Sequence, residues 1–234
     1  MKILRISACL AFALVATAAL AADRKEVRDV KGFDSVALSA PVDVDITQGA
    51  TEGLVLEGDE ARLAEVETVV EDGKLRIRLR KQHSWNWSKV RAHLAVKDLH
   101  ALGISGSGDI KAATLNSGNF EISISGSGDV FIGALMADRL RVAIAGSGDI
   151  DVAGKVDRAD FSIAGSGDVK AGRLEARQSK IAITGAGDAT VWAHESVDVS
   201  IVGSGDVRYF GEATLSKSVM GSGSVKRLAA LPGS

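Results

Sequence analysis

A four-residue phrase that recurs seven times constrains what this 234-residue chain can fold into more than any other feature. Each copy carries two glycines separated by one small residue, and six of the seven copies end in aspartate. The copies begin at Gly106, Gly126, Gly146, Gly165, Gly185, Gly203 and Gly221, at spacings of 20, 20, 19, 20, 18 and 18 residues. A period this regular is typical of solenoids, in which each repeat packs on its two neighbours.

Apolar residues keep fixed places relative to the phrase. A β-branched residue stands two positions before every first glycine: Ile104, Ile124, Ile144, Ile163, Ile183, Ile201 and Val219. A second column follows the phrase directly: Ile110, Val130, Ile150, Val169, Ala189, Val207 and Val225. A looser third column consists of Leu115, Leu135, Val156 and Leu174. Because neighbouring side chains of a strand point to opposite faces, these columns predict strands with one buried face.

The strands and corners together predict an all-β fold, a single-stranded parallel β-helix with three short sides and about 18–20 residues per coil. Strand–corner–strand connections favour the right-handed form. The paired glycines fit sharp corners, because corners that stack about 4.8 Å apart leave little room for side chains. Propellers need about 40 residues per blade, and leucine-rich repeats need a leucine and asparagine ladder that is absent here.

The part of the chain before the repeats also has strand-like patterning. Residues 22–101 lack the phrase but contain runs in which apolar and polar residues alternate. We expect strands there that cap the solenoid and are continuous with it, while residues 102–234 form the repeat β-helix. Residues 59–64 are predicted to form one helical turn, and Asp72-Gly73 a tight hairpin turn.

Residues 1–21 are typical of a signal peptide, with Lys2 and Arg5 before an apolar run and small residues suited to cleavage before Ala22. The run of about 15 apolar residues is shorter than the roughly 20 that span a bilayer. We therefore expect an exported protein, in the periplasm or at the cell surface, with no transmembrane segment after cleavage. Cleavage removes Cys9, the single cysteine. The formal charge of −2 gives no indication of nucleic acid as a partner.

The aspartates of the phrase are candidate metal ligands: Asp109, Asp129, Asp149, Asp168, Asp188 and Asp206. Stacked about 4.8 Å apart, neighbouring carboxylates repel by roughly 0.9 kcal/mol even in water. Backbone amides at the glycine corners offset this repulsion in one interpretation. In the other, bound cations do so, and calcium is then the one candidate cofactor. Known calcium-binding repeats have a different spacing, with a nine-residue period.

Two tryptophans, Trp85 and Trp87, lie in the polar stretch 83–88. An exposed tryptophan pair can stack on sugar rings, which makes the two residues candidate ligand-binding groups. In the alternative interpretation, the two indoles fold back over the first coil and cap its apolar end.

The outward positions of the strand before the phrase are nearly all small: Ser105, Ser123, Ser125, Ala143, Ala145, Ser162, Ala164, Ala182, Thr184 and Ser200. A sheet face built from such residues is flat. We expect residues 22–100 to cover it, or its hydroxyl groups to form ladders; the alternative is a docking face for another subunit or an extended polymer.

The order of several motifs resembles a known family. Residues 32–36 read Gly-Phe-Asp-Ser-Val, residues 42–49 read Val-Asp-Val-Asp-Ile-Thr-Gln-Gly, and residues 75–77 read Leu-Arg-Ile. Together with the repeated Gly-Ser-Gly-Asp-Ile/Val, this order is similar to that of the head GIN domain family. The resemblance implies an exported bacterial β-solenoid, and it brings no catalytic residues with it.

Catalysis finds little support in the sequence. The outward row after the phrase is mixed, without an acid–base constellation: Lys111, Phe131, Asp151, Lys170, Thr190, Arg208 and Lys226. We therefore predict a non-enzymatic structural or binding module of the cell envelope, acting in adhesion or envelope assembly. Its expected partners are an envelope protein or polysaccharide, and a homo-oligomer is compatible with the sequence. The alternative is a β-helix protein that binds or cleaves polysaccharide.

Overall fold

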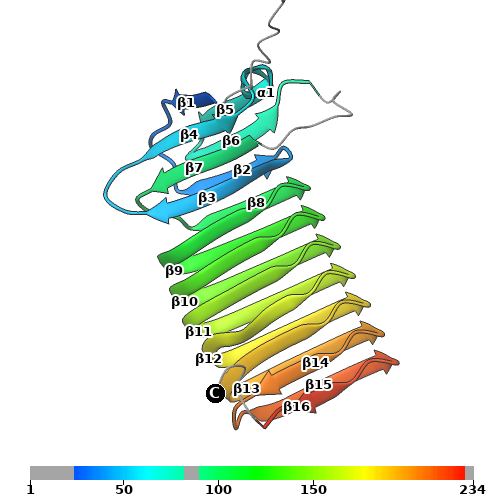
Figure 1. Ribbon diagram of the computed structural model, residues 1–234. Coiled ribbons are helices and arrows are strands. Elements are labelled where there is room, and N and C mark those ends of the chain that lie inside the picture. The colour runs from blue at the N-terminus through cyan, green and yellow to red at the C-terminus, as the bar shows by residue number, and fades with distance from the viewer. Residues whose placement is uncertain (1–23, 82–89, 230–234) are drawn as a thin grey trace, which may run out of the picture.

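The structure, a computed structural model, describes residues 24–81 and 90–229. It is a stack of parallel β-coils with about six turns (Figure 1). The blue N-terminal strands lie at one end of the stack and the red C-terminal strands at the other. This architecture confirms the predicted all-β solenoid. Within the described ranges, no helix is long and apolar enough to cross a membrane.

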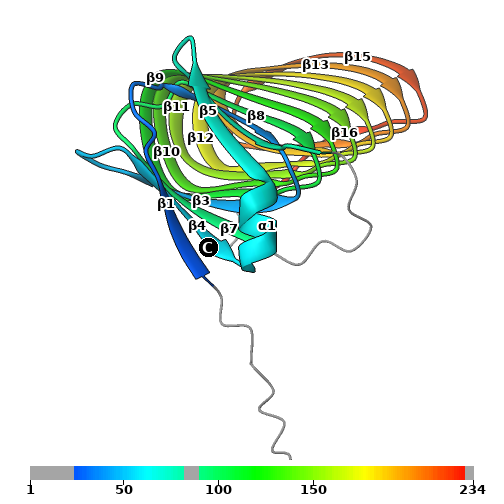
Figure 2. The same cartoon turned by 90° about the horizontal axis from the view of Figure 1, so that it is seen from above.

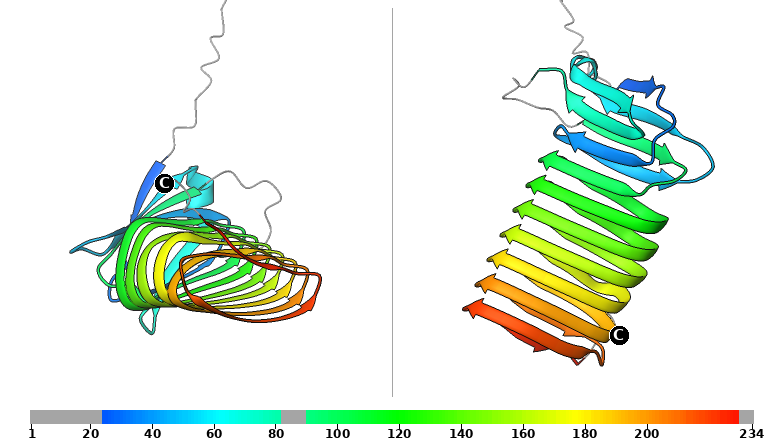
Figure 3. Two further views of the ribbon diagram at one scale, coloured as in Figure 1. Left: turned by 90° about the horizontal axis from the view of Figure 1, so that it is seen from below. Right: turned by 180° about the vertical axis from the view of Figure 1, so that it is seen from behind.

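Each full coil of the repeat region is one long strand that bends around the core (Figure 3). These strands are β9 (Ile110–Gly126), β10 (Val130–Gly146), β11 (Ile150–Gly165), β12 (Val169–Gly185) and β13 (Ala189–Gly203). Each begins directly after one phrase and ends on the first glycine of the next. The predicted short sides are therefore segments of a continuous strand. In β9, for example, the inward–outward alternation slips at Ala113 and Thr114, which both face outward.

The corners of the coils stay in register through the whole stack. The first glycines of neighbouring coils are Cα partners from Gly106 to Gly221. The unequal repeat lengths are absorbed elsewhere, since the β10–β11 register shifts between Ile132 and Leu135. Gly154 takes a φ of 128° there, and a Cβ on it would lie 2.0 Å from the Leu135 carbonyl oxygen. Only glycine fits this compressed bend.

The core is a column of aliphatic side chains enclosed by the coils. The three predicted columns are buried over the full coils, as Ile124 at 1%, Val130 at 1% and Leu135 at 0% exposure illustrate. Phe120 and Phe161 are also inside, at 2% and 3%. Each such side chain stabilises the fold by roughly 1.5–3 kcal/mol, so this column is the main source of stability.

The N-terminal part of the chain extends the stack at its end. β2 (Ser35–Ser39) pairs in parallel with β8 (Ala101–Gly106), and β3 (Val42–Gln48) pairs in parallel with β9. Beyond them, β6 (Lys74–Leu79) lies on β2 and β7 (Val90–Val96) lies on β3. The chain therefore builds the second coil first, passes to the outer coil, and returns to start the repeats.

The outer coil carries antiparallel strands and the short helix (Figure 2). β4 (Gly53–Gly58) pairs with β7, β1 (Arg24–Arg28) pairs with β4, and β5 (Val66–Glu71) pairs with β6. α1 (Glu60–Glu65) is the predicted helical turn, and the Asp59 side chain accepts the Ala61 N–H at 2.9 Å as its N-cap. Leu63 is 1% exposed and joins the core. The helix therefore helps to cover the apolar end.

The C-terminal end consists of β14 (Val207–Phe210), β15 (Thr214–Gly221) and β16 (Val225–Arg227). Val219 and Met220 of the last coil are exposed by 39% and 71%. Lys217 lies opposite the buried Val199 of the preceding coil. A charge at an inward position of a terminal strand discourages pairing with another chain. Lys217 thus suits the end of the stack.

Gly148, the second glycine of the third phrase, tests the corner geometry. A Cβ on Gly148 would lie 2.3 Å from the Gly128 carbonyl oxygen and 2.8 Å from Ile124 Cγ2. We expect Gly148→Ala to lower the free energy of unfolding by about 3 kcal/mol or more, because stacked backbone must separate to admit a methyl group. Gly49→Ala is the control, since a Cβ there meets nothing within 4 Å. Equal stabilities of the two variants in chemical denaturation would contradict this account.

Candidate functional site

The six aspartates of the phrase form a ladder of hydrogen bonds along the corners. The Oδ1 atom of each aspartate accepts the backbone N–H at the same position of the next coil, at 2.8–3.0 Å. The ladder runs from Asp109 to Ser224, which stands in place of aspartate in the seventh phrase. Hydrogen bonds from N–H groups favour the ionised carboxylate. They therefore offset the repulsion between stacked charges.

The second carboxylate oxygens, Oδ2, are free for partners outside the ladder. Asp149 Oδ2 lies 3.1 Å from Lys170 Nζ, and this hydrogen bond and the attraction between the charges raise the pKa of Lys170. Among the described residues, Asp109 and Asp129 have no corresponding partner for Oδ2. The hydrogen-bond partner of Oδ2 therefore differs from coil to coil.

A cation along the ladder would need several oxygen ligands from one place. Calcium takes six to eight oxygen ligands. Over residues 24–81 and 90–229, no three or more His, Cys, Asp or Glu side chains are grouped so that they could hold a metal ion. Calcium binding by the ladder stays a prediction, and the hydrogen bonds supply another source of stabilisation.

Substitution of Asp149 separates the two interpretations of the ladder. We expect Asp149→Ala to lower the free energy of unfolding by about 1 kcal/mol, because the Asp168 N–H loses its acceptor. Asp149→Asn keeps an acceptor oxygen and should cost less. The melting temperature of the parent protein should be the same in calcium and in chelator. A rise with calcium that Asp149→Ala removes would establish a cation site instead.

The ladder ends in a double hydrogen bond that tests its electrostatics. The Ser224 hydroxyl and backbone N–H donate to Asp206 Oδ1 at 2.8 and 2.9 Å, and both lower the pKa of Asp206. Such a group contributes stability above its unfolded-state pKa, and the contribution is lost as the pH falls through the folded-state pKa. Since the hydroxyl is the largest cause, Ser224→Ala should raise the pKa of Asp206. NMR titration of the carboxyl carbon measures it, and an unchanged pKa would refute the assignment.

The predicted ligand-binding tryptophans, Trp85 and Trp87, lie outside the described residues, between β6 and β7. Both interpretations, the sugar-binding pair and the cap, stay predictions.

The predicted flat face of small residues is present, and it is open. Its exposed members are Ser105, Ser123, Ser125, Ala143, Ala145, Ser162, Ala164, Thr184 and Ser200, and Ala182 is half-buried. The expectation that residues 22–100 cover this face is wrong for the part of that region that the structure describes. The described part of that region continues the stack at its end, and therefore leaves the sides of the repeat coils uncovered (Figure 1).

A column of alternating charge borders the open face. It lies five residues before each first glycine and consists of Glu121, Arg141, Asp160, Lys180 and Asp198, which are partners in successive registers. Arg139 Nε also donates to Asp160 Oδ2 at 2.9 Å. Beside the column lies a hollow of about 350 Å³, lined in part by Arg141, Arg158 and Lys180. This column was not predicted, although its alternation is visible when the repeats are aligned on their first glycines.

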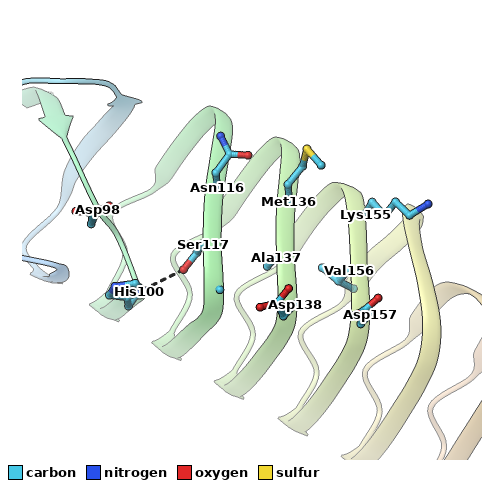
Figure 4. Close-up of a pocket in the computed structure, with 11 residues that line it drawn as sticks. Asp98, His100, Asn116, Ser117, Met136, Ala137, Asp138, Lys155, Val156 and Asp157 are labelled. Carbon is cyan, nitrogen blue, oxygen red and sulfur yellow. Dashed lines mark hydrogen bonds between the residues drawn. The ribbon is translucent and has the colours of Figure 1, made fainter.

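A second hollow, of about 540 Å³, crosses β9, β10 and β11 and has an acidic lining (Figure 4). Asp138 and Asp157 occupy matching positions in neighbouring coils. His100 Nδ1 lies 3.1 Å from Ser117 Oγ, and Met136 is exposed at the rim. No sequence motif marks this hollow, because its residues come from separate coils and their types differ from coil to coil: the position of Asp138 and Asp157 is Gly118 in the preceding coil.

The stacked coils, the hydrogen-bonded aspartate ladder and the open flat face define a β-solenoid. The family model described as “Putative auto-transporter adhesin, head GIN domain” matches residues 32–213, and the chain belongs to this family. The match confirms the resemblance found in the sequence. The family and its structures suggest a non-catalytic binding module.

Solved structures support the same assignment. A “putative adhesin” from Bacteroides fragilis superposes with a TM-score of 0.85 at 27% identity, covering 88% of this chain and 97% of that chain. A “putative lipid binding protein” from Parabacteroides distasonis gives 0.71 at 28% identity, covering 89% and 97%. A “putative adhesin” from Parabacteroides merdae gives 0.71 at 21% identity, covering 89% and 97%, and shows the fold alone. The comparison with curated proteins finds no match.

Proposed function

We propose that this protein is an exported, non-catalytic binding module that holds an extended partner along its open face, in adhesion or envelope assembly. The observation that carries the proposal is the exposure of that face over every full coil. The partner is an envelope protein or a polysaccharide, since either can lie along several coils at once.

The composition of the face suits a long, weakly held partner. Small side chains such as Ala145 and Ser162 lose little conformational entropy when a partner covers them. The same contact repeats about every 4.8 Å along the stack, so many weak contacts can add up to firm attachment. Val202 and Met220, exposed by 47% and 71%, add apolar surface at the C-terminal coils.

Export and adhesion rest on the family and on the start of the chain. The family name and the Bacteroides fragilis neighbour both refer to adhesins. The signal-peptide pattern in residues 1–21 lies outside the described residues and stays a prediction. The lipid-binding name of the Parabacteroides distasonis neighbour makes lipid a second ligand to test.

An array of bacterial polysaccharides, with lipid vesicles printed beside them, tests the open face. We expect Ala145→Arg to reduce binding of the parent's ligand by tenfold or more, because the long side chain prevents close approach to the flat sheet. Thr114→Arg is the matched control, since Thr114 is exposed on another part of the coil. Equal binding by both variants would exclude the open face as the binding surface. Binding of vesicles alone would replace the polymer with a lipid.

A further inference from the structure

Phe131 is the only Phe, Tyr or Trp side chain that is exposed in the described part of the chain, at 40%. It projects outward from β10, in the row after the corner, between Lys111 and Asp151 of the neighbouring coils. This row is separated from the open face by the corner and the aspartate ladder. A single exposed apolar residue is ordinary on its own. The concave, charged surroundings of Phe131 distinguish it from such a residue.

Phe131 lies in a hollow of about 480 Å³ that spans several coils. The polar groups that line this hollow are four carboxylates and two ammonium groups, from Asp109, Asp129, Asp149, Asp151, Lys111 and Lys170. An apolar ring is thus set among charged hydrogen-bonding groups on a concave surface. Ligand sites typically combine apolar area with a few convergent polar groups in this way.

The polar groups of the hollow divide into paired and available ones. Asp149 pairs with Lys170 at 3.1 Å, and the Arg173 guanidinium donates to Asp151 Oδ1 at 3.0 Å. The available groups are on the other side of Phe131. Asp109 and Asp129 use Oδ1 in the ladder, and neither their Oδ2 atoms nor Lys111 Nζ has a partner among the described residues. Two strong acceptors and one donor therefore remain beside the ring.

We propose that this hollow, called here the Phe131 site, binds a pyranose unit of a neutral polysaccharide. One face of a pyranose ring carries C–H groups, whose partial positive charge is drawn to the negative face of an aromatic ring. The hydroxyl groups around the ring can donate to Asp109 and Asp129 and accept from Lys111, and such charge-assisted bonds are strong. The Phe131 site provides each of these groups on adjacent coils.

The charge of the site selects among sugars. The four carboxylates outnumber the two lysines and the arginine that pairs with Asp151, so an acidic polysaccharide would meet net repulsion. A neutral sugar meets none, and its hydroxyls replace the water on the free carboxylate oxygens. The Phe131 site rests on the proposed binding function but is separate from the open face, so either surface can be removed without the other.

Calorimetry with soluble neutral polysaccharides tests the proposal. The probes are dextran, mannan, laminarin and galactan, with polygalacturonate as the acidic comparison. We expect the parent protein to bind at least one neutral probe and Phe131→Ala to weaken that binding about tenfold or more. Phe131→Trp should bind at least as well as the parent, since it enlarges the platform. Met136→Ala is the control, because Met136 is also exposed and apolar but lies in another hollow.

Three results would overturn the Phe131 site: no neutral probe is bound, polygalacturonate is preferred, or Phe131→Ala binds as the parent does. Melting curves of each variant check that the fold is retained. Ala145→Arg separates the two surfaces. Binding lost in Ala145→Arg but kept in Phe131→Ala would reject the Phe131 site while the open face stands. The opposite pattern would support the Phe131 site and remove the polysaccharide from the open face.

Discussion

The contact of backbone with backbone at the glycine corners is the constraint on which the structure depends. The first and second glycines of each phrase lie so close to their counterparts in the preceding coil that a Cβ would come within 2.1–2.4 Å of a carbonyl oxygen at most corners. Two hydrogen bonds join neighbouring coils at these corners: the Ser127 N–H donates to the Gly106 carbonyl oxygen at 2.9 Å, and the Asp168 N–H donates to Asp149 Oδ1 at 2.9 Å, with equivalents along the stack. Close stacking therefore sets one register for all corners. Differences in repeat length are accommodated elsewhere in the coil, as at the register shift between Ile132 and Leu135.

This register determines what the outer surface can do. Because corresponding residues align from coil to coil, any outward position becomes a column along the stack. One pair of columns gives the flat open face, and a neighbouring column alternates in charge from Glu121 to Asp198. The row that contains Phe131 is instead irregular, because aromatic, acidic, basic and hydroxyl side chains follow one another without a pattern. Regular columns suit a long repetitive partner, and an irregular row suits one local ligand.

Much of the fold could be predicted because the repeats impose it locally. Inward columns, corners and the aspartate ladder follow from a period of about 20 residues and from the two-residue alternation of strands. The path of residues 24–100 could not be predicted, since β2 and β3 bind β8 and β9 through pairing partners more than 60 residues away. The hollows were missed for a related reason. Asp138 and Asp157, or Phe131 and Lys111, occupy equivalent positions of neighbouring repeats, but the sequence does not show that each pair lines one hollow.

By itself, the sequence determined the coil: where the chain turns, which side chains enter the core, and that aspartate follows each corner. These are local properties, decided by glycine geometry and by the alternation of buried and exposed residues. Only the tertiary structure decided that the small-residue face is open, because this depends on where residues 24–100 pack. It also decided which Oδ2 atoms of the ladder remain available. Asp149 Oδ2 accepts a hydrogen bond from Lys170, whereas Asp109 and Asp129 have no partner for Oδ2 within the described chain. Such outcomes depend on pairing between coils, and no single repeat contains that information.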